Sequence, residues 1–421
     1  MHHFHYVDGA LHCEGVAIEA LAEQVGTPFY LYSHATLTRH YQAFDQAFEG
    51  IEHLVCFSAK ANSSQAILRL LANLGAGLDI VSGGELYRGL KAGFDPSVIV
   101  YSGVGKTAPE IDSALEQGIF MLNVESRQEL DLINARAGRL GCRAPVAVRV
   151  NPDVDPQTHP YISTGLKKNK FGLSPETALE VYRDARRMPH VQIIGIDCHI
   201  GSQITAAAPF RDALSRLRGL VELLAREKID IRVVDMGGGL GITYQNEQPP
   251  HPVDYGDAIR EGLEGLDVRL VLEPGRVIVG NAGVLVTRVL YRKEGEQKRF
   301  MVVDAGMNDL IRPSLYDAVH AIWPVCEASD QGLIKADVVG PICETGDFLS
   351  RDRDVPDAAP GDLLAIMSAG AYGFTMASNY CSRRRVPEVM VSKDDYHIIR
   401  ERQTYDDLMA GESIPHFIQE S

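Results

Sequence analysis

The chain of 421 residues has no long apolar run, no closely spaced cysteine pair and no basic stripe. No segment approaches the roughly 20 apolar residues that a membrane-spanning helix needs, so we expect no membrane partner. The seven cysteines are never spaced as CxxC, which argues against a disulfide framework and a structural zinc site, and we expect no metal. With 41 basic and 56 acidic residues the net charge is −15, so nucleic acid is a poor candidate partner.

The amino-terminal stretch MHHFHYVDGALHCEG lacks the basic start and apolar block of a secretory signal. We therefore expect a cytoplasmic protein that is not exported. Hydrophobic residues at 45% and charged residues at 23% are ordinary for a soluble enzyme. A small molecule is the better candidate ligand.

From about residue 50 the sequence repeats one unit, in which a short apolar run is followed by a turn and an amphipathic helical stretch such as residues 214–224. Apolar strands that alternate with helices predict a parallel sheet, and eight repeats favour a closed (β/α)8 barrel. An open doubly wound sheet is the alternative, because it also places ligands at strand ends. The eight runs are residues 53–61, 77–82, 97–103, 121–126, 145–151, 193–202, 232–239 and 268–276.

After about residue 284 the pattern changes to strand-like segments without long helices between them, which predicts a second, mainly β domain. The opening segment is also strand-like and is expected to join that domain. We therefore predict amino-terminal strands of the β domain in residues 1–34, the barrel in residues 35–283, and the carboxy-terminal β domain in residues 284–421.

Reactive side chains collect where the predicted strands end, which is the catalytic face of such barrels. Lys60 ends the apolar run VCFSAKAN, where an ammonium needs a partner or loses its proton and becomes a nucleophile. His199 and Ser202 end the sixth run, and a structural histidine is the alternative reading there. The glycine cluster 237–241 could approach a phosphate, or could form a tight turn.

Glu273 and Arg276 end the eighth run in the segment EPGR. A structural salt bridge between them is the plain interpretation. Pro274 and Gly275 instead suggest a rigid bend that aims the two side chains separately.

Taken together, seven segments resemble the fold-type III pyridoxal-phosphate decarboxylases, in their order and spacing, and most closely the diaminopimelate decarboxylases. The resemblance covers nearly the whole chain. It implies a pyridoxal 5'-phosphate-dependent carboxy-lyase that converts meso-2,6-diaminopimelate to L-lysine and carbon dioxide through an external aldimine, in the last step of lysine biosynthesis. The segments are FSAKAN (57–62), GLDIVSGGEL (77–86), HIGSQI (199–204), GGGLGI (237–242), EPGR (273–276), CETGD (343–347) and GAYGFTMASNY (370–380).

The resemblance also implies roles for residues at the cofactor. Lys60 resembles the Schiff-base lysine, and His199 the imidazole that stacks on the cofactor ring. Glu273 is similar to the carboxylate that pairs with the pyridine nitrogen and makes the ring a strong electron sink, which favours decarboxylation over racemisation. The implied cofactor-binding residues are Lys60, His199, Ser202, Gly238, Gly239, Glu273, Gly275, Arg276 and Tyr372.

Further residues match those that bind the substrate in the family. Diaminopimelate carries a second ammonium and a second carboxylate at its far end, and a pair of arginines suits that carboxylate. A substrate with a purely cationic tail, such as ornithine or lysine, would instead need acidic residues. Cys343 resembles the proton donor, and is implied to act across a homodimer interface with shared active sites, as are Glu344 and Tyr372. The implied substrate-binding residues are Arg276, Arg312, Tyr316, Glu344 and Tyr372.

Two departures and two alternatives limit the resemblance. Cys381 and Arg384 stand where the family usually has asparagine and proline, and they could reshape the pocket. A related decarboxylase of carboxynorspermidine or of a carrier-bound glutamyl group is one alternative, and a cofactor-binding regulator without catalysis is the other. The polar run at residues 166–170 also suggests a mobile loop.

Overall fold

The computed structural model describes residues 2–155, 158–159, 162, 164–165, 169–327 and 332–419. The chain divides into two compact units. The barrel unit comprises Thr36–Asn281 and Gly370–Thr375, and the β unit comprises Met1–Ala35, Ala282–Ala369 and Met376–Ser421. Most of the expected mobile run at 166–170 lies outside the described residues.

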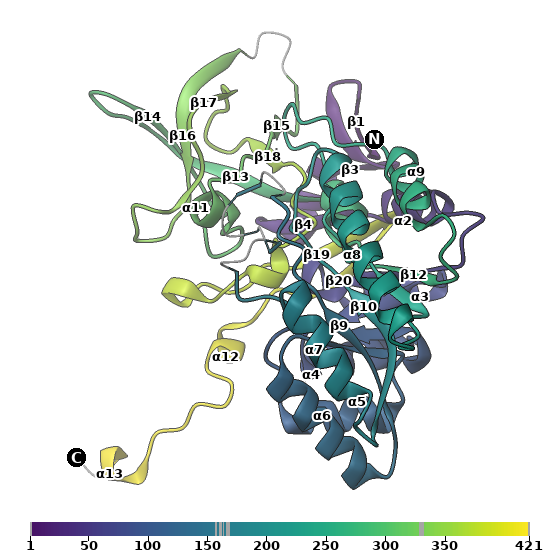
Figure 1. The fold of residues 1–421 in the computed structure, drawn as a ribbon. Helices are drawn as coiled ribbons and strands as arrows, with labels where there is room; N and C mark the ends of the chain where they lie inside the picture. The colour runs from purple at the N-terminus through teal and green to yellow at the C-terminus, as the bar shows by residue number, and fades with distance from the viewer. Residues whose placement is uncertain are drawn as a thin grey trace. The chain divides into compact units, whose positions relative to one another are not determined.

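Eight parallel strands of the barrel unit form a closed barrel, in which the last strand pairs with the first. This closure confirms the predicted barrel, and the open doubly wound sheet is wrong. Each strand falls within one of the eight predicted runs or overlaps it. The strands are β5 (His53–Ser58), β6 (Gly77–Ile80), β7 (Ile99–Tyr101), β8 (Met121–Val124), β9 (Ala144–Arg149), β10 (Val191–Asp197), β11 (Val233–Asp235) and β12 (Arg269–Leu272). Figure 1 labels three of them, β9, β10 and β12.

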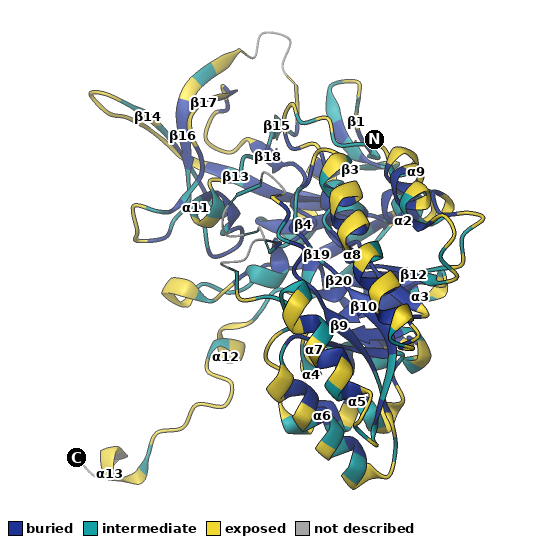
Figure 2. Cartoon of the chain, in the orientation of Figure 1, coloured by how far each residue is buried: buried dark blue, intermediate teal, exposed yellow. Residues whose placement is uncertain are grey.

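The strands are mainly apolar and almost wholly buried, because both of their faces are covered. Figure 2 shows β9 and β10 largely in the colour of buried residues, while the helices α5, α6 and α8 turn exposed faces outward. The helices of this unit are α2 (His34–Gln46), α3 (Gln65–Asn73), α4 (Gly83–Ala92), α5 (Ala108–Gln117), α6 (Arg127–Leu140), α7 (Pro175–Ala185), α8 (Ala208–Arg226), α9 (Pro252–Leu263) and α10 (Arg276–Val279).

Side-chain caps fix where several of these helices begin, directly after a strand. The Ser82 hydroxyl accepts the N–H of Glu85 at 3.2 Å at the start of α4, and the Ser126 hydroxyl accepts the N–H of Glu129 at 3.1 Å at the start of α6. Such caps satisfy donors that the first helical turn leaves unpaired. They hold short, defined loops at the carboxyl ends of the strands.

The β unit contains the predicted mainly β architecture, and the amino-terminal segment joins it. Strand β4 (Phe29–Ser33) pairs antiparallel with β13 (Gly283–Glu294) and parallel with β19 (Glu388–Ser392). The remaining strands are β1 (Phe4–Val7), β2 (Ala10–Cys13), β3 (Val16–Ala17), β14 (Arg299–Val303), β15 (Ile322–Pro324), β16 (Leu333–Val339), β17 (Phe348–Pro356), β18 (Leu363–Ile366) and β20 (Asp395–Arg400).

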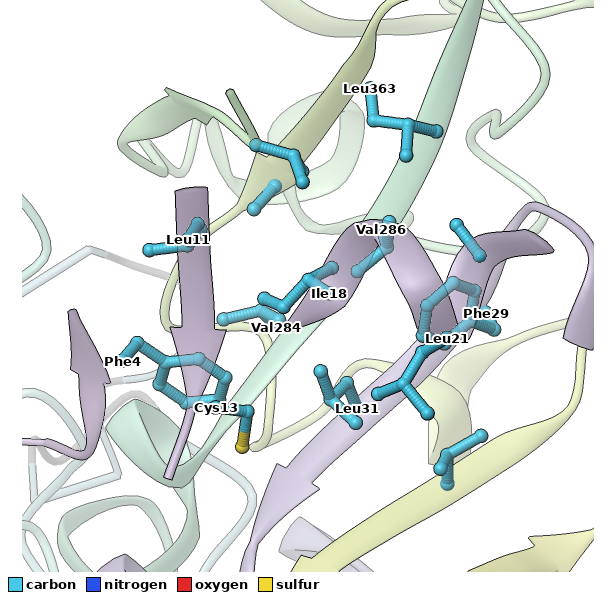
Figure 3. Packing of buried hydrophobic residues seen from close by; sticks show 14 of the residues in the cluster. Phe4, Leu11, Cys13, Ile18, Leu21, Phe29, Leu31, Val284, Val286 and Leu363 are labelled. Atoms are coloured by element: carbon cyan, nitrogen blue, oxygen red, sulfur yellow. The ribbon is translucent and has the colours of Figure 1, made fainter. Parts of the chain in front are cut away.

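The core of the β unit joins residues that are far apart in the sequence. Figure 3 shows Leu31 of β4 and Val284 of β13 in one cluster with Ile18 of helix α1 (Ile18–Val25). All three side chains are fully buried. The short helices of this unit are α11 (Arg312–Tyr316), α12 (Tyr405–Leu408) and α13 (His416–Gln419). Among the described residues, no helix is both long and apolar enough to cross a bilayer.

Candidate active site

A cavity lies in the barrel unit at the carboxyl ends of β5, β10, β11 and β12, where sequence reasoning placed the chemistry. All of its lining residues belong to the barrel unit. The structure brings together every residue that the resemblance assigned to the cofactor. These are Lys60, His199, Ser202, Gly238, Gly239, Glu273, Gly275, Arg276 and Tyr372.

Lys60 lies on a 3-10 turn directly after β5, and its side chain is 35% exposed, which leaves the amine accessible to a ligand. Its Nζ forms an ion pair with the fully buried carboxylate of Asp79 on β6, and lies 3.3 Å from Ser58 Oγ. Burial lowers the pKa of Lys60, but the charges of Asp79 and Glu273 outweigh burial and raise the pKa. The amine is therefore protonated, so nucleophilic attack requires that a proton first leaves Nζ.

Asn62 supports the turn that carries Lys60. Its amide donates to the carbonyl oxygen of Gly370 at 3.1 Å, and its Oδ1 accepts the N–H of Ser64 at 3.0 Å. The backbone N–H of Tyr372 donates to the carbonyl oxygen of Ala61 at 2.8 Å. These bonds connect the lysine turn to residues 370–375, which are distant in the sequence.

His199 is held against the glycine loop. Its Nδ1 accepts the N–H of Gly238 at 3.0 Å, so this ring nitrogen carries no proton. Burial, followed by the charges of Arg149 and Lys60, lowers the pKa of His199 well below its usual range. His199 is therefore a neutral imidazole with a fixed ring orientation.

The loop after β11 requires glycine for steric reasons. A Cβ on Gly238 would lie 2.2 Å from the carbonyl oxygen of Glu273, and a Cβ on Gly239 would lie 2.6 Å from that of Gly201. Gly237 and Gly239 also have positive φ angles of 63° and 118°. The backbone can consequently approach a ligand without side chains between them.

Glu273 and Arg276 do not form the salt bridge that was the plain interpretation, because each binds other partners among the described residues. Glu273 Oε1 accepts from the Ser102 hydroxyl at 3.0 Å. Arg276 donates to Ser202 Oγ at 3.0 Å and to the hydroxyl of Tyr244. The bend at Pro274 and Gly275 therefore directs the carboxylate and the guanidinium to separate parts of the site.

Tyr372 lines the cavity of its own chain, with its ring centroid 5.0 Å from Arg276 Cζ. The resemblance implied that Tyr372 reaches the site from a neighbouring subunit. The observed position differs, because residues 370–375 are bonded to the lysine turn of the same chain.

The other predicted residues lie in the β unit. Arg312 is buried at the start of α11, where its Nε donates to His320 Nε2 at 3.4 Å and its Cζ lies 5.9 Å from the ring centroid of Tyr316. Cys343 and Glu344 are exposed, and Glu344 accepts from the hydroxyl of Tyr380 at 2.6 Å. Arg312 is thus preorganised by its own unit.

Sequence reasoning did not single out four polar residues of the site, namely Ser58, Asp79, Ser102 and Tyr244. Asp79 is a single acid in the apolar run GLDIVS, and it is 0% exposed. A buried carboxylate without a sequence-adjacent cation needs a partner from another strand, which is the signal that could have identified it. Tyr244 follows the glycine loop as an isolated aromatic residue.

Neither departure from the family lines the cavity of the barrel unit. Cys381 and Arg384 belong to the β unit, where they line a separate polar cavity with Arg383 and Arg402. Arg384 Cζ lies 4.6 Å from the ring centroid of Tyr405.

The residues of the cavity fit pyridoxal phosphate. The glycine loop forms a cradle that any Cβ would fill. The amine of Lys60 and the carboxylate of Glu273 line the same cavity. Ser202 and Arg276 supply hydrogen-bond donors of the kind that a phosphate requires. Within the described part of the chain, Arg276 Nε is buried and has no acceptor. A bound anion would satisfy this guanidinium.

Comparison with known proteins agrees with this geometry. The family model described as "Pyridoxal-dependent decarboxylase, pyridoxal binding domain" matches residues 34–280. The diaminopimelate decarboxylase of Pseudomonas aeruginosa is 55% identical over 98% of this chain and 99% of its own length. That of Vibrio cholerae is 52% identical, over 98% of this chain and 99% of its own length.

Solved structures of the same kind are similar over nearly the whole chain. Diaminopimelate decarboxylase from Helicobacter pylori, complexed with L-lysine, has a TM-score of 0.90 and 44% identity, and the match covers 93% of this chain and 98% of that one. The enzyme from M. jannaschii, in co-complex with L-lysine, has a TM-score of 0.93 and 41% identity, with 98% of both chains covered. The chain therefore belongs to the pyridoxal-dependent decarboxylases, and among them to the diaminopimelate decarboxylase family.

Proposed function

We propose that this chain decarboxylates meso-2,6-diaminopimelate to L-lysine and carbon dioxide, with pyridoxal phosphate as its cofactor. The observation that carries the proposal is the single cavity in which Lys60, Glu273 and the glycine loop meet. The names of relatives at 55% and 52% identity support this substrate over carboxynorspermidine or a carrier-bound glutamyl group.

When bound, pyridoxal phosphate supplies an aldehyde for amines and an electron-withdrawing ring that accepts the electron pair left as carbon dioxide departs. Lys60 supplies the amine that anchors the cofactor, and Asp79 is the carboxylate in contact with its Nζ. Glu273 would accept a hydrogen bond from the protonated ring nitrogen. Ser202, Arg276 and the N–H groups of the glycine loop would hold the phosphate.

The residues of the β unit complete the proposed chemistry. The guanidinium of Arg312 suits the distal carboxylate of diaminopimelate, and Glu344 suits its distal ammonium. Cys343 would donate a proton to the carbon that has lost its carboxylate. The exposure of Cys343 and Glu344 supports a role at the site of a second chain, and we propose a cytoplasmic homodimer with shared active sites.

A panel assay tests the substrate. The holoenzyme is incubated with meso-diaminopimelate, L-lysine, L-ornithine and carboxynorspermidine, and released carbon dioxide is measured. We expect turnover of diaminopimelate alone, and a rise of at least about tenfold in the Michaelis constant for Arg312→Ala, because one charge-assisted bidentate contact is lost. Arg351→Ala is the control, since Arg351 is an exposed arginine of the same unit. Preferential turnover of another amino acid, or an unchanged Michaelis constant, would contradict the assignment.

A further inference from the structure

Hydrogen bonds run from Glu273, after β12, through Ser102 and Asn123 on the opposite side of the barrel and back to Asp235 on β11, the strand next to β12. Ser102 follows β7, Asn123 lies on β8 and Asp235 ends β11, and their exposed fractions are 4%, 0% and 0%. Asn123 Nδ2 lies 3.0 Å from Ser102 Oγ and 3.1 Å from Asp235 Oδ2, and Ser102 Oγ lies 3.0 Å from Glu273 Oε1. Neither the family comparison nor the sequence motifs assign a role to this chain of hydrogen bonds.

We propose that Ser102 and Asn123 are positioning residues that hold Glu273 as a carboxylate, with Oε1 occupied and the second oxygen left for the pyridine nitrogen of the cofactor. This inference rests on the proposed function. It adds two residues that touch neither substrate nor cofactor and act through Glu273.

The direction of the hydrogen bonds follows from donor counting. The Asn123 amide has two N–H donors, of which one points to Asp235 and the other to Ser102. Asp235 Oδ1 takes the N–H of Gly237 at 2.9 Å, so Oδ2 is the oxygen that the Asn123 amide meets. Since Ser102 Oγ accepts from Asn123, its single proton is directed to Glu273. Glu273 Oε1 is therefore an acceptor.

Both positioning residues are fixed by contacts of their own. The backbone N–H of Ser102 donates to the carbonyl oxygen of Ile80 at 2.8 Å. The ammonium of Lys106, which is itself buried, donates to the carbonyl oxygen of Asn123 at 2.6 Å and to that of Gly103 at 2.8 Å. The loop after β7 and the end of β8 are thereby held together, so the Ser102 hydroxyl is preorganised toward Glu273.

Glu273 needs such a donor. Burial, followed by the charges of Asp235 and Asp79, raises its pKa well above the usual range, and Lys60 and Arg149 lower it. A protonated Glu273 could not accept a hydrogen bond from a pyridinium at the same oxygen. A donated hydrogen bond favours the charged form of a carboxyl group and opposes the effect of burial.

The test reads the ring nitrogen directly. Wild type, Ser102→Ala, Ser102→Thr and Asn123→Leu are reconstituted with pyridoxal phosphate labelled with ¹⁵N in the ring, and the ¹⁵N chemical shift is followed between pH 6 and pH 9. We expect Ser102→Ala and Asn123→Leu to lower the pKa of the ring nitrogen by about one unit and kcat by about tenfold, with the Michaelis constant unchanged. Ser102→Thr retains the hydroxyl and should restore both values.

Ser64→Ala is the matched control, because Ser64 is 2% exposed and its hydroxyl has no partner among the described residues. It should leave the shift and kcat as in wild type. The proposal is overturned if Ser102→Ala, or Asn123→Leu where the first variant does not fold, gives the wild-type titration. Failure of the proposed function would look different, since the wild-type holoenzyme would then not release carbon dioxide from diaminopimelate.

Discussion

Gly238 occupies a position where a side chain would collide with the barrel, since its Cβ would lie 2.2 Å from the carbonyl oxygen of Glu273. We expect Gly238→Ala to displace the loop or the EPGR turn and to weaken binding of pyridoxal phosphate by at least about tenfold, because a packed site does not absorb such an overlap. Fluorescence titration of the apoprotein measures the dissociation constant.

Gly219 provides the control for Gly238. It lies in the interior of α8, where a Cβ would meet nothing within 4 Å. Gly219→Ala should bind the cofactor as wild type does and should be more stable by roughly 1 kcal/mol, because alanine favours a helix interior. Equal cofactor binding by the two glycine variants would contradict the steric argument.

Asp235 makes the stability of the apoprotein depend on pH. Burial, followed by the charge of Asp197, raises the pKa of Asp235 to about 8 from an ordinary value of 3.8. The pKa of Asp235 is higher in the folded state than in the unfolded state. Its contribution to the free energy of unfolding is therefore most favourable below pH 3.8 and is lost as the pH rises to about 8. The Asp235→Asn side chain cannot ionise, so the free energy of unfolding of this variant, relative to that of wild type, should increase as the pH rises from 3.8 to about 8. Urea unfolding at several pH values measures the difference, which should not be constant.

At the residue scale, the sequence indicated those residues of the cavity for which the end of a strand coincides with a motif. Lys60 and Glu273 could be placed because each ends an apolar run in a recognisable segment. Asp79, Ser102 and Asn123 could not be placed, since a single polar residue in a buried strand or directly after one has no periodic pattern, and its partner lies on another strand. Their pairing depends on barrel register, such as Ser58 opposite Asp79.

At the scale of elements, α8 carries a clear test of helix packing. Leu217 is 1% exposed on its inner face, while Leu223 of the same helix is 37% exposed. We expect Leu217→Ala to lower the free energy of unfolding by about 2 to 5 kcal/mol, as buried leucines do, and Leu223→Ala to change it by less than about 1 kcal/mol. Denaturant unfolding compares the two, and similar losses would show that the inner face is not the packed one.

The predicted runs located all eight barrel strands but overestimated the length of every one. Within the run at 97–103 only three residues form strand β7, and within the run at 232–239 only three form β11. The loops that follow these strands are also largely buried, so the apolar composition continues beyond the residue where the hydrogen bonds between strands end. The apolar stripe of α8 was predictable because a helix that packs on one side repeats its buried residues every three to four positions.

At the scale of the whole molecule, shared active sites predict complementation between inactive variants. Lys60 belongs to the barrel unit and Cys343 to the β unit. Co-expressed Lys60→Ala and Cys343→Ala chains should form heterodimers with one intact site, and the mixture should regain about a quarter of wild-type activity, as expected for random symmetric pairing. Lys60→Ala with Glu273→Gln is the control, because both changes affect the same cavity and no activity should return. Activity no higher than the sum of the separate variants would rule out shared sites.

The domain boundaries at residues 34/35 and 283/284 stay a prediction. A change from alternating strands and helices to strands alone marks where a barrel ends. A short segment such as Gly370–Thr375, where the chain comes back to the barrel unit, cannot be recognised from its composition. Sequence periodicity describes consecutive residues, whereas a compact unit is defined by contacts between distant ones.

Lysine formation by the Lys60→Ala variant tests the central claim most directly. Purified wild type with pyridoxal phosphate should convert meso-diaminopimelate to equal amounts of L-lysine and carbon dioxide and should show the visible absorbance of a covalently held cofactor. Lys60→Ala should lose both together, because the role proposed for its amine is both to anchor the cofactor and to permit turnover. If Lys60→Ala kept the absorbance and still formed lysine, the assignment of this cavity as the active site would be wrong.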